Sequence, residues 1–288
     1  MKNICVYRAL PLSGLILLLF IYNSTFGQTV PEPKKHKNPR SWYFSWGYNG
    51  EWYTRSTVHV KMNGEGDNYD LVHVQAHDHK GWDDGLFQKQ LTIPQYNYRL
   101  GCYFNEKQDL AIELNFDHTK YIITDGEKIH LKGSHSNVKS DTTIIFSEGN
   151  GFYYYLNNGA NFFLINIVKR HGLYRTKDNN LRIDFTGKVG VGPVIPHVEN
   201  SFFGHKNDPH FQFGGWNTGI ETAFRFTIMK YAYIEMSQKV DYARYSNLKI
   251  YDGTAKQNFG TYELILSGGI FLPSKKHNPM FAKTNSIK

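Results

Sequence analysis

Two histidines that stand two residues apart, His77 and His79, have the spacing that most directly predicts chemistry in this chain. In an extended strand the side chains of residues i and i+2 point to the same side, as a His-x-His zinc or copper site requires. His73 or His59 would supply a third nitrogen. The pattern first predicts a solvated polar face, with a zinc or copper site at His73, His77 and His79 as the alternative. No other cofactor is expected.

Charged residues recur at alternate positions of otherwise apolar segments, so that in a strand they share one face. Opposite charges enclosed in a narrow, poorly hydrated space must pair, or each costs several kcal/mol. We therefore predict a network of ion pairs in an enclosed interior. Its expected members are Glu51, Arg99, Glu113, Asp117, Arg182, Asp184, Lys188, Glu221, Arg225, Glu235, Lys239, Asp241 and Glu263.

The elements that would position these charges are strands. The segment 41–54 places its large aromatic residues, from Trp42 to Trp52, on one face and Ser45, Asn49 and Glu51 on the other. A strand with one apolar and one polar face fits a transmembrane barrel, where the apolar face meets lipid. Seven further segments show the same alternation. They are 95–104, 110–117, 160–174, 181–191, 220–228, 232–242 and 259–272.

The connections between these segments alternate in length. Residues 105–109, 177–180 and 229–231 form short turns, whereas about 55–94, 118–159, 192–210 and 252–258 form long loops. Bacterial outer-membrane barrels have an even strand number, short periplasmic turns and long outer loops. We therefore predict an all-β fold, an eight-stranded antiparallel transmembrane β-barrel with long outer loops and both termini in the periplasm.

Within the first long loop, residues 57–80 return to a strand pattern around a turn at 63–68. Val58, Val60 and Met62 share one face of the first arm, and the histidines lie on the opposite face of the two arms. We predict an extra hairpin that stands above the barrel. In the third long loop, aromatic residues beside histidines predict a girdle at the rim of the barrel. These aromatic residues are Phe202, Phe203, Phe211, Phe213 and Trp216.

The N-terminus has the features of a signal peptide, with a basic start, an apolar run at 10–22 and small residues before Gln28. The run is shorter than the ~20 residues that span a bilayer. The expected division is a signal peptide at 1–27, a basic periplasmic leader at 28–40, the barrel at 41–272 and a flexible basic periplasmic tail at 273–288.

Charge argues against a nucleic-acid partner. Of the 33 lysines and arginines, two lie in the signal peptide and eight in the leader and tail. The body therefore carries 23 basic residues against 24 acidic ones, since one of the 25 acidic residues also lies in the leader. A neutral body lacks the basic face that nucleic-acid binding requires.

With its signal peptide, aromatic strands and alternating connections, the segment 41–272 resembles the small outer-membrane barrels of the OmpA transmembrane domain and OmpW type. The resemblance implies the fold and a location in the outer membrane of a Gram-negative bacterium. We expect a structural or surface ligand-binding role, with outer-membrane lipid and an extracellular ligand or partner protein as contacts.

A lipid-modifying enzyme is the alternative, because barrels of this size include lipid A deacylases and acyltransferases. The deacylase type resembles a serine hydrolase with His and Ser two residues apart on one strand face, so that the imidazole can take the hydroxyl proton. In this chain no histidine has Ser or Thr two residues after it. Partners from different strands would then be needed, and no catalytic residue is assigned.

Overall fold

The computed structural model describes residues 41–64, 66–79, 95–105 and 107–272. All of these residues belong to one compact unit, Asn38–Lys288. The predicted signal peptide, leader and tail lie outside the described residues, as do residues 80–94 of the first long connection. In the part of the chain that is described, no helix is long and apolar enough to cross a membrane.

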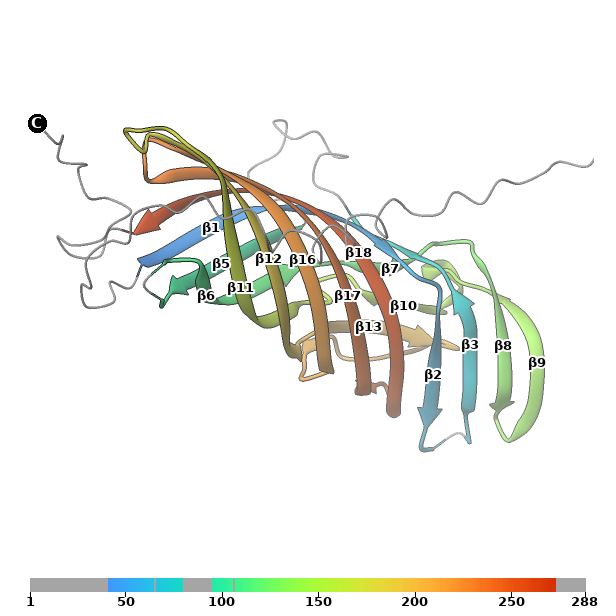
Figure 1. Cartoon of the computed structure of the whole chain (residues 1–288). Coiled ribbons are helices and arrows are strands. Elements are labelled where there is room, and N and C mark those ends of the chain that lie inside the picture. The colour runs from blue at the N-terminus through green and yellow to red at the C-terminus, as the bar shows by residue number, and fades with distance from the viewer. Residues whose placement is uncertain (1–40, 65, 80–94, 106, 273–288) are drawn as a thin grey trace, which may run out of the picture. The chain divides into compact units, whose positions relative to one another are not determined.

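Eight antiparallel strands of the described chain pair into a closed ring (Figure 1). In order around the ring they are β1 (Ser41–Tyr53), β5 (Tyr96–Tyr103), β6 (Leu110–His118), β11 (Phe162–Arg175), β12 (Leu181–Val194), β16 (Gly215–Ile228), β17 (Ala232–Ile250) and β18 (Gly253–Leu272). The ring closes between the first and last strands, from Trp42 opposite Leu272 to Tyr53 opposite Thr261. A closed ring leaves no edge strand, which is what a barrel in lipid requires.

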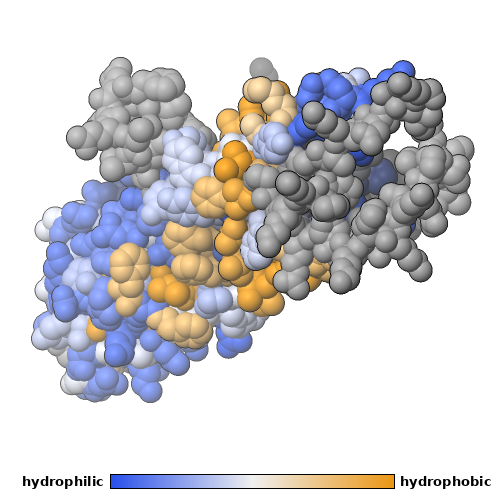
Figure 2. Space-filling model, turned by 90° about the vertical axis from the view of Figure 1, so that its left-hand side faces the viewer, coloured by the Kyte–Doolittle hydropathy of each residue, from blue (hydrophilic) through white to orange (hydrophobic). Residues whose placement is uncertain are grey.

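The strands of the ring expose apolar side chains outward and bury polar ones inward. Ile112, Leu114, Phe224 and Leu264 are 46–54% exposed. The glutamates that adjoin them in sequence, such as Glu113, are buried. Figure 2 shows hydrophobic residues gathered in a band on one face of the molecule, beside a more hydrophilic region. A soluble barrel has the opposite polarity, so this exterior fits lipid and not water.

Glycines inside the ring make room for large lumenal side chains. Gly101 lies opposite Tyr43 in the register, and a Cβ added there would overlap the Tyr43 ring. Gly269 stands in the same relation to Tyr233 on the neighbouring pair of strands. Each glycine therefore lets an aromatic ring lie flat against the wall, which packs the interior without widening the barrel.

Two ring strands continue past the barrel into a second sheet, which we call the extension sheet. The first residues of β18, Gly253–Lys256, pair with β2 (Ser56–Met62). The pairing then passes to β3 (Asn68–Val74), β8 (Lys128–His135) and β9 (Val138–Ile145), as Figure 1 shows. The predicted loop at 252–258 is wrong, because β17 runs to Ile250 and β18 starts at Gly253.

The first long connection also differs from the prediction in its setting. β2 and β3 pair with each other, from Val58 opposite Leu71 to Lys61 opposite Asn68. Each strand also pairs with a further neighbour, β2 with β18 and β3 with β8. The two arms are therefore inner strands of a larger sheet and do not stand apart above the barrel.

Short strands from the long connections form a second wall across from the extension sheet. They are β4 (Ala76–His77), β7 (Tyr121–Ile123), β10 (Tyr153–Leu156), β13 (His197–Phe202), β14 (His205–Lys206) and β15 (His210–Phe211). An apolar core that includes Val58, Leu71, Leu131 and Tyr154 is buried here. Phe202 belongs to the same core and is fully buried, so its predicted place in a rim girdle is wrong.

Candidate functional site: a charged lumen

The lumen of the ring is filled by charged side chains. All thirteen residues predicted for the charge network are buried, each at most 6% exposed. They reach the interior because they occupy the inward positions of β1, β5, β6, β12, β16, β17 and β18, where alternation turns every second residue away from lipid. A barrel of eight strands has an interior that side chains alone can fill.

Lys188 on β12 is the centre of the middle layer. Its Nζ lies 2.9 Å from Glu221 Oε1, 3.0 Å from Glu235 Oε1 and 3.4 Å from Glu113 Oε1. Tyr43 from β1 donates a hydrogen bond of 2.7 Å to the second carboxylate oxygen of Glu113. One ammonium on β12 thus contacts carboxylates from three other strands, β6, β16 and β17, and offsets part of their buried charge.

Arg99 and Lys239 continue this network toward the extension sheet. The Nη1 atom of Arg99 lies 2.6 Å from Asp117 Oδ1, and its Nη2 lies 3.4 Å from Glu221 Oε2. Asp117 also accepts from Lys239 at 2.6 Å. Lys239 in turn lies 3.4 Å from Glu263 on β18. Asp117 and Glu221 each bridge two cations. The group around Lys188 and the group around Arg99 and Lys239 therefore form one connected array.

Arg225 anchors the array toward the end that carries the short turns. Its Nε donates to Glu235 at 2.6 Å. Its guanidinium carbon lies 4.6 Å from the ring centroid of Tyr43 and 4.3 Å from that of Tyr233. Aromatic faces favour a cation at this range, which compensates part of the lost hydration.

Three of the predicted members lie outside the connected array. Glu51 is hydrogen-bonded by Asn49 and Tyr53, and among the described residues it has no cation within ion-pair distance. Asp184 contacts Arg182 only at 3.9 Å, near the short-turn end. The contact between Asp184 and Arg182 is longer than the ion pairs of the central layers, and Glu51 is held by hydrogen bonds instead of an ion pair.

Several lumenal residues were not among the predicted members. Asn166 on β11 donates to Glu113 at 3.1 Å, and Arg170 lies 3.9 Å from Asp184. The inward-facing Tyr43 and Tyr103 both contact Arg225. Strand parity places the two tyrosines on the polar face, but their apolar rings match the lipid-facing pattern equally well.

The predicted metal ligands are not gathered together. Among the described residues no three His, Cys, Asp or Glu side chains form a group that could hold a metal ion. The ring nitrogen Nδ1 of His77 contacts the Asp78 carbonyl at 2.7 Å. The backbone N–H of His79 donates to Gln95. The geometry of this region therefore gives the zinc or copper prediction no support.

Inside the extension, hydroxyls rather than charges meet across the core. The hydroxyls of Ser56 and Tyr121 are 2.8 Å apart, and Gln257 donates to Ser56 at 2.8 Å. Burial raises the pKa of the Tyr121 hydroxyl well above its usual value, and the contacts with Ser56 and Gln257 partly offset that rise. These buried groups stay neutral at physiological pH and act as structural hydrogen-bond partners.

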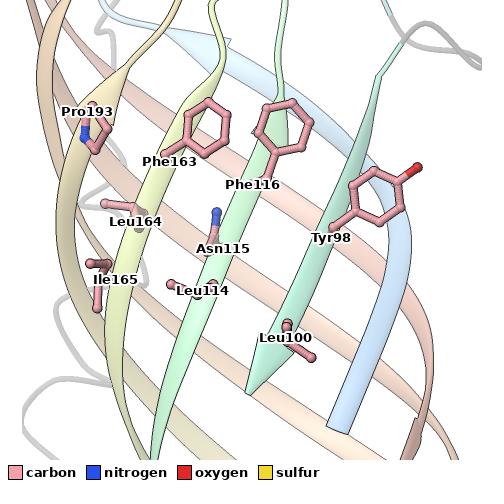
Figure 3. Close-up of a pocket in the computed structure, with 9 residues that line it drawn as sticks. All are labelled: Tyr98, Leu100, Leu114, Asn115, Phe116, Phe163, Leu164, Ile165 and Pro193. Atoms are coloured by element: carbon pink, nitrogen blue, oxygen red, sulfur yellow. The ribbon is translucent and has the colours of Figure 1, made fainter. Parts of the chain in front are cut away.

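An apolar pocket of about 350 Å³ opens on the outer wall of the ring, where β5, β6, β11 and β12 meet (Figure 3). The rings of Phe116 and Phe163 lie side by side there, with their centroids 4.7 Å apart. Leu100, Leu114 and Ile165 line the same pocket and are exposed. The pocket belongs to the lipid-facing surface and is lined by no charged side chain.

No protein-family model and no curated protein matches the sequence. Solved structures of outer-membrane proteins do resemble it. OprG from Pseudomonas aeruginosa is 11% identical, with 84% of this chain and 100% of that chain covered and a TM-score of 0.38. The outer membrane protease OmpT from Escherichia coli is 9% identical, with 83% and 99% covered and a TM-score of 0.39. Ail from Yersinia pestis, in complex with the heparin analogue sucrose octasulfate, is 15% identical, with 81% and 99% covered and a TM-score of 0.32. The likeness is one of outer-membrane barrel architecture and does not extend to activity.

Proposed function

We propose that this protein is an outer-membrane β-barrel whose lumen is closed by ion pairs and whose extension sheet serves as a binding surface outside the cell. The observation that carries the proposal is the connected array from Arg225 to Glu263, which crosses the lumen through contacts of 2.6–3.4 Å. The residues of the array are each at most 3% exposed, which supports a lumen without a continuous aqueous path.

The membrane placement rests on the exterior of the ring. Outward residues such as Ile165, Val189, Ile220 and Met236 are each at least half exposed, and all are apolar. The short turns of outer-membrane barrels are periplasmic. The turns that join β5 to β6, β11 to β12 and β16 to β17 lie at one end, and the extension sheet lies at the other. The extension sheet is therefore extracellular.

A structural and binding role fits this architecture better than lipid modification does. The hydrogen bonds described for the side chains of His59, His118 and His135 go to aspartate or asparagine and not to a hydroxyl that could act as a nucleophile. The lumenal carboxylates of the array are paired with cations, which makes them weaker general bases. We therefore assign no catalytic residue.

Electrical recording tests the closed lumen. Protein refolded into planar bilayers should show no stable conductance, and heat-modifiable migration on gels should show that the barrel is folded. A steady, ion-selective channel from folded wild-type protein would mean that the charges line a pore. Lys188→Ala is the matched variant, because it opens the middle layer and should raise conductance if the array is the barrier.

Topology is tested by cysteine labelling of intact cells. In a Cys102→Ser background, Thr143→Cys on β9 should react with a membrane-impermeant maleimide. Asp178→Cys, in the short turn between β11 and β12, should react only after the cells are lysed. The reverse pattern of labelling would place the extension sheet in the periplasm.

A further inference from the structure

The outward face of the extension sheet carries a set of lysines, which we call the lysine face. Directly opposed residues of antiparallel strands share one face of a sheet, so the register decides which side chains belong to it. One row runs from Lys249 on β17 through Lys61 on β2 to Lys139 on β9. The complete set is Lys61, Lys128, Lys132, Lys139, Lys249 and Lys256, and all six are exposed.

The acidic residues on the same face are already engaged. Asp70 lies 2.5 Å from Nδ1 of His59, its direct cross-strand neighbour. Asp141 lies 3.2 Å from Nε2 of His130. Among the described residues none of the six lysines has a carboxylate within ion-pair distance. The face therefore carries six lysines against two aspartates across six strands, an excess of four positive charges over a width of about 24 Å.

From this charge pattern we propose that the lysine face binds an acidic polysaccharide outside the cell, an inference that rests on the proposed extracellular position of the sheet. Lysines two strands apart are separated by about 10 Å, which suits a chain whose negative groups repeat. Lysine is a point charge on a flexible stem and lacks the rigid fork with which arginine grips a single phosphate or carboxylate.

The distance from the membrane argues for a soluble polyanion over the headgroups of the membrane's own glycolipid. The Trp52 and Tyr262 rings, 5.8 Å apart, lie on the outward face at the extension end of the apolar surface. Lys256 lies six residues before Tyr262 on β18, toward the extension, which is about 14 Å higher for a strand tilted by ~45°. Headgroup phosphates lie at the level of the aromatic rings, below the lysine face.

The other residues of the lysine face do not suit a single-stranded nucleic acid or a protein partner. Its cross-strand rows contain no Phe, Tyr or Trp on which the bases of a single-stranded nucleic acid could stack. A protein partner would need an apolar centre, and only Val72 and Ile145 are apolar on this side. Charge is therefore the dominant recognition element, and the ligand is a chain of repeated anions.

The test measures binding of the full-length refolded protein to dextran sulfate and polygalacturonate, with neutral dextran as the blank. The face variant carries Lys61→Glu, Lys132→Glu and Lys256→Glu. The control variant carries Lys107→Glu, Lys177→Glu and Lys230→Glu in the short turns, so its net charge is the same. We expect the face variant to lose about tenfold or more in affinity and the control to change by less than about twofold.

Equal loss in both variants, or no loss in the face variant, would overturn the proposal. Stronger competition by single-stranded DNA or by lipopolysaccharide micelles than by dextran sulfate would also overturn it, in favour of a nucleic acid or of membrane headgroups. Heat-modifiable migration and closed bilayer recordings are made on the same samples. If those two hold while the binding result fails, only the ligand is wrong and the closed barrel stands.

Discussion

The long strands β17 and β18 take part in both the ring and the extension. Their inward and outward faces exchange polarity between the two regions. Along β17 the inward residues Glu235 and Lys239 are charged, and the outward residues beside them, such as Met236, are apolar. Beyond Tyr242 the pattern reverses, with Tyr245 buried inward and Lys249 exposed outward. Alternation continues, but the medium that meets the outward face changes from lipid to water. The reversal locates the edge of the membrane.

The two interiors are consequently held together by different forces. In the extension, apolar burial provides the stabilisation, as in a soluble protein. In the ring, lipid already surrounds the apolar side chains, so their burial gives no comparable gain, and paired charges and hydrogen bonds hold the interior. A substitution of one kind should therefore have different consequences in the two regions.

The largest expected effect comes from removing a central cation. Lys188→Ala leaves Glu113, Glu221 and Glu235 without their shared ammonium and should lower the free energy of unfolding by about 3–5 kcal/mol. Urea titration of the folded protein in lipid measures the change. Lys249→Ala, an exposed lysine of the extension, should stay within about 0.5 kcal/mol. Equal effects would mean that the lumenal pairs contribute nothing beyond surface charge.

An apolar truncation should act on the extension alone. Leu71→Ala removes a fully buried side chain from the extension core and should cost about 2–5 kcal/mol. Limited proteolysis should then cut the extension while the ring keeps its heat-modifiable migration. Val138→Ala, on a side chain that is 67% exposed, is the control. Loss of the ring together with the extension would contradict separate stabilisation of the two regions.

Arginine scanning along one face of β18 should reveal the membrane edge. Leu264→Arg, on the lipid-facing side of the ring, should cost about 2–4 kcal/mol. Asn258→Arg lies on the same face of the strand beyond the reversal and should cost almost nothing. Unfolding titrations of the two variants give the comparison. Similar costs for both would move the predicted edge of the membrane.

The smallest effect is expected from overpacking the lumen. Gly101→Ala drives a methyl group into the Tyr43 ring and should cost about 1–3 kcal/mol. Gly268→Ala is the matched control on β18, because a Cβ there meets no atom within 4 Å. The difference in unfolding free energy between these two variants measures how tightly the lumen is packed. No difference would show that the tyrosines can move aside.

The sequence by itself determined the ring. Alternation is a local property, so the facing of Leu264 and Glu263 follows from the pattern of β18 alone. The short turns and the parity of the connections then predicted eight antiparallel strands. The same parity placed all thirteen network charges in the lumen, and the structure buries each of them.

Only the tertiary structure decided which charges meet and what the long connections build. Lys188 and Glu113 are brought within 3.4 Å by contacts across the lumen, which no single strand encodes. In β17 the pairing shifts register between Tyr245 and Leu248, so that both side chains face inward although they are three residues apart. A search for strict two-residue alternation therefore misses this part of the strand. His77 and His79 show the same limit: side chains two residues apart share a direction in a strand, but a metal site needs a third ligand that only the fold can bring near. Strand register and contacts across the lumen depend on residues far apart in the sequence. They therefore cannot be predicted from the pattern of a single strand.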